Sequence, residues 1–434
     1  MAQRIDRAAS FGQNLYVDTR GAAGEPVPFT QAVINGLAQG GGLYVPEELP
    51  TLSLDEICAL ARLPYAQRAA AIYKAFNVDL PDEAIDDLMG RAYGDNFDDE
   101  AICPITSLDE STHILELWHG PTSAFKDMAL QCLPHFFSAS AEKLLDEYRI
   151  TLSSANSINW GRLLPQVVYY ISSYAELVAA GKIEAGCPID VCVPTGNFGN
   201  ILAAWYAKQI GVPIERLLCA SNDNRVLTDF INTGTYDISD REFILTSSPS
   251  MDILVSSNLE RQLFELTGRN GEAIRQWMAD LADARCFRVD AETFRRVREN
   301  FSADSVDNAT CLATIREVLD AHDYLLDPHT AVAYAAAQNL RGENPVLIAS
   351  TAHWAKFGNN VYRAIHGIEP SGELPADVAA LTGCELNKLI AEETDKHHIP
   401  AGLANLDTMQ VRFTEVIDND VEAIEDAAEA FLTR

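Results

Sequence analysis

The chain has 434 residues, a length that predicts two large domains or three smaller ones at roughly 150 residues each. Apolar residues make up 47% and charged residues 22%, which excludes wholesale disorder. We find neither a membrane-spanning apolar run nor an apolar stretch typical of a secretory signal, so we expect a soluble, cytoplasmic protein. The net charge of −31 argues against nucleic acid and anionic membranes as partners.

The first hundred residues predict short helices and loops. Helices are expected at residues 30–36 and 52–61, on either side of the glycine-rich turn 40–42, and Ser53 is placed to cap the second one. Nine cysteines occur without a Cys-x-x-Cys motif, a pattern that predicts reduced, buried thiols and no metal site.

A strand, a turn and a helix are predicted next. Residues 113–118 form a mostly apolar run typical of a strand, and residues 119–121 contain the Gly-Pro pair of a turn. Thr122 then stands where an N-cap is expected, so we predict a helix over residues 123–138.

From residue 189 onward, apolar runs alternate with helical segments. Strands buried on both faces are predicted at residues 189–193, 217–220 and 346–349. Helices are predicted at residues 200–210, 328–340 and 421–432. The second of these helices follows Asp327-Pro328, and the third is amphipathic. This alternation predicts an α/β fold with a mainly parallel sheet.

Lys126 is the first candidate for chemistry. In the first turn of its predicted helix, the helix dipole disfavours an ammonium ion, and Ala124 and Phe125 desolvate it. A lysine whose pKa is lowered in this way is suited to forming a Schiff base. The alternative, favoured by these cues alone, is a surface lysine paired with Asp127.

Two further features complete a set. The loop 194–200 lies between a predicted strand and a helix, where glycines let backbone N–H groups approach an anion, although an ordinary turn explains it equally well. Ser350 and Thr351 end another strand, where a hydroxyl can face a ring nitrogen or simply cap the backbone. An amine for an aldehyde, a loop for a phosphate and a hydroxyl for a pyridine are what pyridoxal phosphate (PLP) requires.

At this point the sequence resembles the threonine synthases, within the tryptophan-synthase-like, fold-type II PLP enzymes. The resemblance spans most of the chain and rests on seven motifs in the same order, at residues 16–21, 40–46, 119–127, 153–162, 196–200, 248–253 and 327–332. It implies a PLP-dependent α/β fold with an N-terminal α/β extension.

The resemblance also implies roles for individual residues. Lys126 matches the family's Schiff-base lysine, and Thr351 matches the hydroxyl that faces the pyridine nitrogen. The cofactor-phosphate loop is matched by Gly196, Asn197, Phe198, Gly199 and Asn200. The implied reaction is a lyase reaction of threonine biosynthesis that converts O-phospho-L-homoserine and water to L-threonine and phosphate.

The substrate's phosphate needs local donors in so acidic a protein. Our candidates for substrate binding are Asn156, Ser157, Arg162 and Lys356. For Arg162 and Lys356, a solvated or ion-paired role is an equal alternative. We expect structural roles for His119, Asp252 and His329.

One departure from the family is large. The family continues after the lysine helix with strands, helices and a Ser-Gly-Asp-Thr-Gly loop, and that loop is absent here. The predicted helix instead leads almost directly into Ser153, so the smaller lobe is expected to lack two or three central βα units of roughly 30 residues each.

The resulting domain prediction has four parts. Residues 1–100 form an N-terminal domain, 101–152 a truncated small lobe, 153–370 the large PLP-binding domain and 371–434 a C-terminal α/β segment. We expect a monomer or homodimer. The alternatives to a threonine synthase are an internally deleted remnant that at most binds PLP, and another fold-type II lyase such as a serine or threonine dehydratase.

Overall fold

A six-stranded sheet lies at the centre of the structure, a computed structural model that describes residues 13–22, 24–144, 153–394, 398–412 and 414–432. In spatial order its strands are β10 (Phe301–Ser305), β7 (Ile214–Ser221), β6 (Ile189–Pro194), β11 (Val346–Ser350), β5 (Thr112–Glu116) and β4 (Ile105–Ser107). All neighbours are parallel except β4 and β5. The sequence predicted four of these strands, β5, β6, β7 and β11, and a mainly parallel sheet. These predictions are confirmed.

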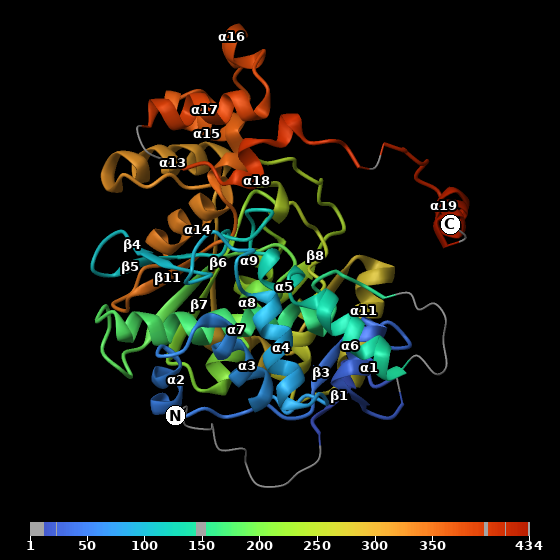
Figure 1. Cartoon of the computed structure of the whole chain (residues 1–434). Coiled ribbons are helices and arrows are strands. Elements are labelled where there is room, and N and C mark those ends of the chain that lie inside the picture. Colours follow the sequence, from blue (N-terminus) through green and yellow to red (C-terminus); the bar gives the residue numbers. More distant parts are fainter. Residues whose placement is uncertain (1–12, 23, 145–152, 395–397, 413, 433–434) are drawn as a thin grey trace.

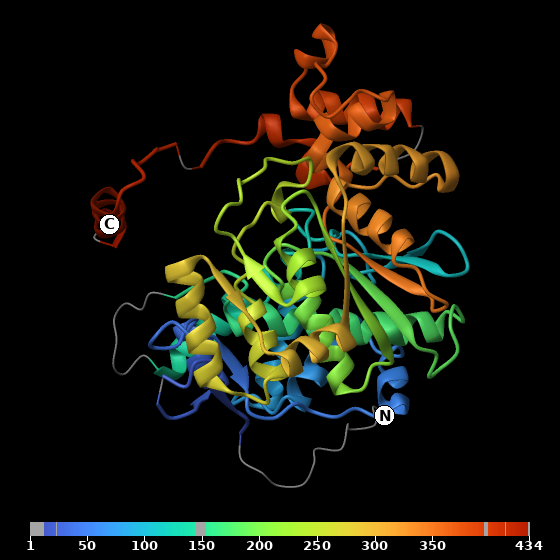
Figure 2. The same cartoon turned by 180° about the vertical axis from the view of Figure 1, so that it is seen from behind.

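Helices cover both faces of this sheet, which explains why its strands read as continuous apolar runs. Successive residues of each strand enter different cores: Leu347 and Ala349 pack with α7 (Trp160–Ala179) and α8 (Gly199–Ile210). Ile348 packs with α13 (Asn308–His322) and α14 (Pro328–Asn339) on the other side. Figures 1 and 2 show the sheet between these two helical layers.

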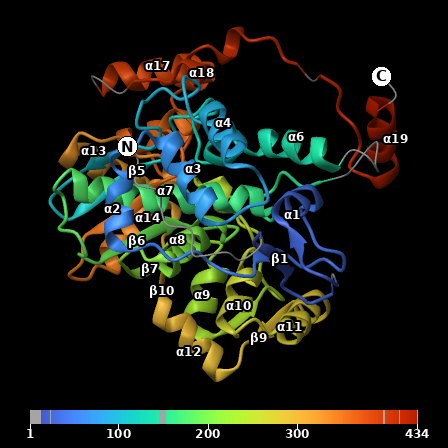
Figure 3. The ribbon, with the colours of Figure 1, turned by 60° about the horizontal axis from the view of Figure 1, so that its bottom comes forward.

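The N-terminal residues form a separate small sheet that packs beside α7. Its antiparallel strands are β2 (Val27–Pro28), β1 (Leu15–Asp18) and β3 (Tyr44–Pro46). Its helices are α1 (Phe29–Asn35), α2 (Leu54–Leu60), α3 (Tyr65–Ala75) and α4 (Asp82–Ala92). The predicted cap is confirmed, because Ser53 and Glu56 form a reciprocal capping box. Figure 3 shows α1 beside α6 (Leu133–Leu144).

The remaining elements flank this frame. Along the chain, six elements lie between β7 and β10: α9 (Val226–Thr233), β8 (Thr235–Asp237), α10 (Leu259–Leu266), α11 (Gly271–Ala284), β9 (Cys286–Arg288) and α12 (Ala291–Asn300). The C-terminal part contains α15 (Gly358–His366), α16 (Ala376–Ala379), α17 (Gly383–Glu393), α18 (Ala401–Ala404) and α19 (Val421–Leu432). Figure 1 shows α19 apart from the other elements, and Val421 and Ile424 of its apolar face are exposed. None of the described helices is long and apolar enough to cross a membrane.

The predicted helix over residues 123–138 is confirmed only in part, because its start is wrong and it is interrupted. Helical structure begins only with α5 (Asp127–Leu130), and α6 follows after a break. Thr122 does not cap a helix; its backbone N–H and hydroxyl donate to the Asp127 carboxylate. The reason is a long-range pairing: Ala124 forms an isolated β-bridge with Ala352, and Ser123 has a left-handed backbone with φ of 53°, so turns replace the helix before Asp127.

The predicted junction of the deleted lobe falls mainly on residues 145–152, which lie outside the described residues. Within the described ranges there is a single parallel sheet, the central one. The missing βα units and the four domain boundaries therefore stay predictions. All nine cysteines have free thiols, and all but Cys58, Cys187 and Cys286 are buried.

Candidate functional site

Three segments with predicted site residues meet at one edge of the central sheet. Strand β11 lies between β5 and β6 and runs parallel to both. The chain therefore leaves all three strands at the same edge: toward Lys126 after β5, into Gly196 after β6, and into Thr351 after β11. In α/β proteins, ligands bind in the crevice at the carboxyl ends of parallel strands.

The loop of residues 120–126, which we call the Lys126 loop, is attached directly to the end of β11. The Phe125 N–H donates to the Thr351 carbonyl at 2.9 Å, and the His353 N–H donates to the Ser123 carbonyl at 3.1 Å. Lys356 adds a bond from its Nζ to the carbonyl of Thr122. The structure thus brings Lys126, Thr351 and Lys356 together.

Lys126 occupies the N-cap position of α5, not the first turn of a long helix as predicted. Although its side chain reaches the surface, partial burial of the ammonium group lowers its pKa, and the Arg162 guanidinium lowers it further. Asp127 is fully buried and accepts hydrogen bonds from Thr122, at 2.7 Å from the backbone nitrogen. The geometry therefore differs from that of a surface lysine paired with Asp127.

The glycine loop between β6 and α8 presents uncapped backbone donors. Phe198 has a left-handed backbone with φ of 61° and provides no side-chain cap for α8. No described residue accepts from the N–H groups of Gly199 and Asn200, the ordinary state of an uncapped first turn. A Cβ on Gly196 would lie 3.0 Å from the Ser250 carbonyl oxygen, so a larger residue would displace the loop.

Asn200 is anchored below this loop. Its Oδ1 accepts from the hydroxyl groups of Tyr169, at 2.9 Å, and Tyr170. Its Nδ2 is buried and has no hydrogen-bond partner among the described residues. A buried amide left with a free donor is costly unless a ligand or water accepts from it. The loop and Asn200 together have the donors that an anion requires.

Two of the predicted substrate-binding residues lie next to the glycine loop. Ser157 accepts from Asn197 Nδ2 at 3.4 Å and from Asn258 Nδ2 at 3.2 Å. Asn156 is exposed, and its Oδ1 accepts from the Ser157 hydroxyl at 3.1 Å.

Arg162 stands in the first turn of α7. Its guanidinium is buried and donates to the Ala155 carbonyl, while its Nε has no partner within the described ranges. Arg162 is close enough to Lys126 to lower its pKa, and Lys126 in turn lowers the pKa of Lys356, which burial lowers most. Three cationic side chains thus share this edge.

The residues that hold the glycine loop in place were not predicted from the sequence. They are common polar residues outside any motif, so nothing in the sequence singles them out. Ser256 donates to the Gly196 carbonyl at 2.6 Å, and Asn258 donates through its N–H to the Asn197 carbonyl at 3.2 Å. His329 has the structural contacts expected for it: its Nε2 accepts from the Ser250 N–H at 3.1 Å. Asp252 likewise accepts from Thr246 at 2.7 Å.

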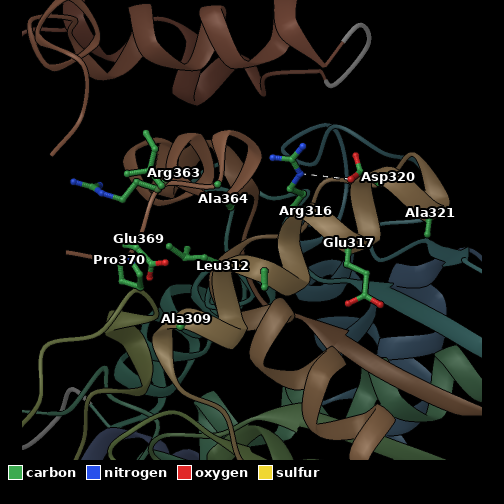
Figure 4. A pocket seen from close by; sticks show the side chains of 13 residues that line it. Ala309, Leu312, Arg316, Glu317, Asp320, Ala321, Arg363, Ala364, Glu369 and Pro370 are labelled. Atoms are coloured by element: carbon green, nitrogen blue, oxygen red, sulfur yellow. Dashed lines mark ion pairs between the residues drawn. The ribbon is translucent and has the colours of Figure 1, made fainter. Parts of the chain in front are cut away.

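A groove elsewhere on the molecule contains none of these residues. It has a volume of about 700 Å³ and lies between α13 and the C-terminal end of α15. Figure 4 shows Leu312 at its centre, with Arg316 and Arg363 on different sides. We therefore place the candidate site at the sheet edge and not in this groove.

Comparison with known proteins identifies the family. The family models for the threonine synthase N terminus and C-terminal part match residues 15–93 and 330–427. "Threonine synthase-like 1" from Homo sapiens is 37% identical over 78% of this chain, which spans only 58% of that protein's length. Threonine synthase from Corynebacterium glutamicum is 31% identical over 81% of this chain and 90% of the bacterial protein.

Solved structures agree on the fold. The crystal structure of PLP-bound threonine synthase from Brucella melitensis superimposes with a TM-score of 0.76 at 31% identity, over 88% of this chain and 99% of that one. The predicted fold class, an α/β PLP fold with a central, mostly parallel sheet, is confirmed. The chain belongs to the threonine synthase family.

Proposed function

We propose that this protein is a PLP-dependent lyase that converts O-phospho-L-homoserine and water to L-threonine and phosphate. The observation that carries the proposal is the convergence of Lys126, the glycine loop and Thr351 at one sheet edge. The threonine synthases are PLP-dependent lyases, and the Brucella melitensis relative was solved with PLP bound. A cytoplasmic location and a monomeric or homodimeric state belong to the same proposal.

The residues present fit PLP. Lys126 offers an amine to the aldehyde, and the free N–H groups of Gly199 and Asn200 offer donors to the phosphate. The buried Nδ2 of Asn200 adds an unpaired donor near this loop. Thr351 is buried at the end of β11, and no described residue bonds to its hydroxyl, which leaves that group for the ring nitrogen. When bound, PLP supplies an electron sink for reactions at the carbons of an amino acid.

The chain's own residues would then bind the substrate and move its protons. The lowered pKa of Lys126 leaves more of its amine uncharged near neutral pH, so it can take a proton from one substrate carbon and return it to another. The Thr351 hydroxyl is a weak acid and would leave the ring nitrogen of the cofactor unprotonated. Arg162 and Lys356 supply positive charge for the substrate's phosphate against a net charge of −31.

A second candidate function, a PLP-binding remnant without synthase activity, is favoured by the length of the alignments. The alignment with the Corynebacterium glutamicum protein runs over 444 positions, whereas 81% of this chain is about 352 residues. About 90 positions therefore face no residue of this chain, which supports the expected loss of two or three βα units. No specific observation favours a serine or threonine dehydratase.

Lys126→Ala tests both candidates. PLP is added to the purified protein, the visible absorbance of lysine-bound cofactor is recorded, and borohydride reduction followed by peptide mapping identifies the lysine. We expect wild type to carry PLP on Lys126 and to release phosphate from O-phosphohomoserine. We expect the variant to lose the attachment and at least about 1,000-fold of the rate.

The matched control is Lys388→Ala, which removes an exposed lysine on α17 and should change neither readout. PLP on Lys126 without phosphate release would reject the synthase and support the remnant. PLP on another lysine, or none bound, would reject both candidates.

A further inference from the structure

His119 lies immediately before the Lys126 loop, between two carboxylates. Its Nδ1 is 2.6 Å from Asp98 Oδ1, and its Nε2 is 2.9 Å from Glu116 Oε2. The His119 and Glu116 side chains are 11% and 9% exposed, whereas that of Asp98 is 41% exposed. The ring also stacks on Trp118 with centroids 4.1 Å apart.

This geometry requires a charged ring. An ionised carboxylate only accepts hydrogen bonds, so both ring nitrogens must carry a proton to satisfy both partners. Burial lowers the pKa of His119, but its hydrogen bonds to Glu116 and Asp98 outweigh that effect and raise the pKa above its ordinary value. Stacking on the Trp118 face further favours a cation.

The contacts of His119 join three segments. Asp98 belongs to the loop after α4, and its backbone N–H donates to the His119 carbonyl at 3.0 Å. Glu116 ends β5 and accepts from Thr106 of β4 at 2.7 Å and from the Tyr324 hydroxyl at 2.8 Å. A histidine cation at this place fixes the point from which the Lys126 loop leaves the sheet.

Trp118, on which the His119 ring stacks, contacts the end of β11. Its indole nitrogen donates to the Ser350 hydroxyl at 3.1 Å, one residue before Thr351. Its ring also contacts His353 edge-on, with centroids 4.7 Å apart, and His353 receives its own side-chain bond from the Ala355 N–H. The loop is thus bonded to β11 at its far end and held by His119 at its near end.

We propose that protonated His119 is a positioning residue that holds the Lys126 loop in the conformation that presents Lys126 at the sheet edge. The role of Lys126 as the cofactor lysine rests on the proposed function; the holding of the loop by His119 does not. The titratable groups that face His119 are Asp98 and Glu116, with Tyr324 behind Glu116 and His353 across Trp118.

The pH dependence follows from the direction of the pKa change. A group whose pKa is raised on folding contributes stability that is complete below its unfolded pKa, about 6.5 for histidine, and that is lost as pH rises through the higher folded value. The Lys126 loop should therefore loosen on the alkaline side, while the rest of the sheet edge stays ordered.

Amide hydrogen exchange of the full chain, measured without PLP at several pH values, tests this proposal. In His119→Gln we expect about 10-fold faster exchange than in wild type for peptides covering residues 117–126, because the charge-assisted bonds to Asp98 and Glu116 are lost. In His119→Arg, which keeps a permanent cation, we expect wild-type exchange at low pH and no additional loosening as pH rises.

His366→Gln is the matched control, since His366 also pairs with a carboxylate, Glu393 at 2.9 Å, but lies on α15. It should leave residues 117–126 unchanged. Equal exchange of these residues in wild type and His119→Gln at every pH would overturn the proposal, as would loosening in His119→Arg equal to that in His119→Gln.

If His119→Gln fails to fold, Asp98→Asn replaces it, because the Asp98 side chain is 41% exposed and this substitution removes only one of the two partners of His119. Unchanged exchange in Asp98→Asn would then overturn the proposal. PLP mapping to Lys126 is read separately, so a cofactor found elsewhere would reject the proposed function without affecting the exchange result.

Discussion

Gly120, the glycine of the Lys126 loop, has no space for a side chain. A Cβ built there would lie 2.8 Å from Asp127 Oδ2, inside the van der Waals distance. Asp127 cannot retreat, because it is fully buried and bonded to Thr122. The glycine therefore allows the turn after His119 to pack against the residue that follows Lys126.

We predict that Gly120→Ala destabilises the protein by about 1–3 kcal/mol, the usual cost of overpacking, and reduces PLP attachment to Lys126. Urea denaturation and borohydride mapping measure the two effects. Gly90→Ala is the control: it lies in α4 with no atom within 4 Å of an added Cβ, so helix propensity should leave its stability equal or higher. Equal stabilities of the two variants would contradict the packing argument.

At the scale of elements, α14 begins with the buried N-cap Asp327, whose carboxylate accepts hydrogen bonds from more than one donor. Asp327 Oδ1 accepts from the His329 backbone nitrogen at 2.9 Å and faces the His329 ring nitrogen at 2.7 Å. Thr330 also donates to Asp327, and it bonds to Ser350 at the end of β11 at 3.1 Å. The helix start and the strand end are thereby joined.

We predict that Asp327→Ala costs about 3 kcal/mol, because it removes the cap and leaves buried donors unpaired. Ser53→Ala, which removes the exposed cap of α2, should cost only about 1 kcal/mol. Urea midpoints of the two variants measure the difference. A smaller loss in Asp327→Ala than in Ser53→Ala would show that the buried network adds nothing.

Local signals were sufficient for elements whose stabilising contacts are local. The Ser53 cap and the Asp327-Pro328 start predicted α2 and α14, and short apolar runs predicted β6 and β11. The Lys126 loop could not be predicted, since its conformation depends on the pairing of Ala124 with Ala352, 228 positions further along the chain. Site residues in motifs were identified, whereas Ser256 and Asn258, which hold the glycine loop, emerge only from the fold.

At the scale of the whole molecule, the net charge of −31 opposes the approach of any anion. We predict that the association rate constant of PLP rises several-fold between about 0.01 M and 0.15 M salt, because the screening length falls from about 30 Å to about 8 Å. Stopped-flow absorbance measures the rate.

Pyridoxal, which lacks the phosphate, is the control ligand and should show little dependence on salt. A PLP rate that falls with salt would mean that Arg162, Lys126 and Lys356 dominate the field at the site.

The order of strands in the central sheet also has a consequence for biosynthesis. Strand β11 lies between β5 and β6 but is made about 150 residues after β6. At roughly 5–20 residues per second, a ribosome needs about 8–30 s for that interval. During this time the nascent chain exposes the facing edges of β5 and β6, so a chaperone that shields unpaired strands should raise the yield of folded protein more than one that acts after release.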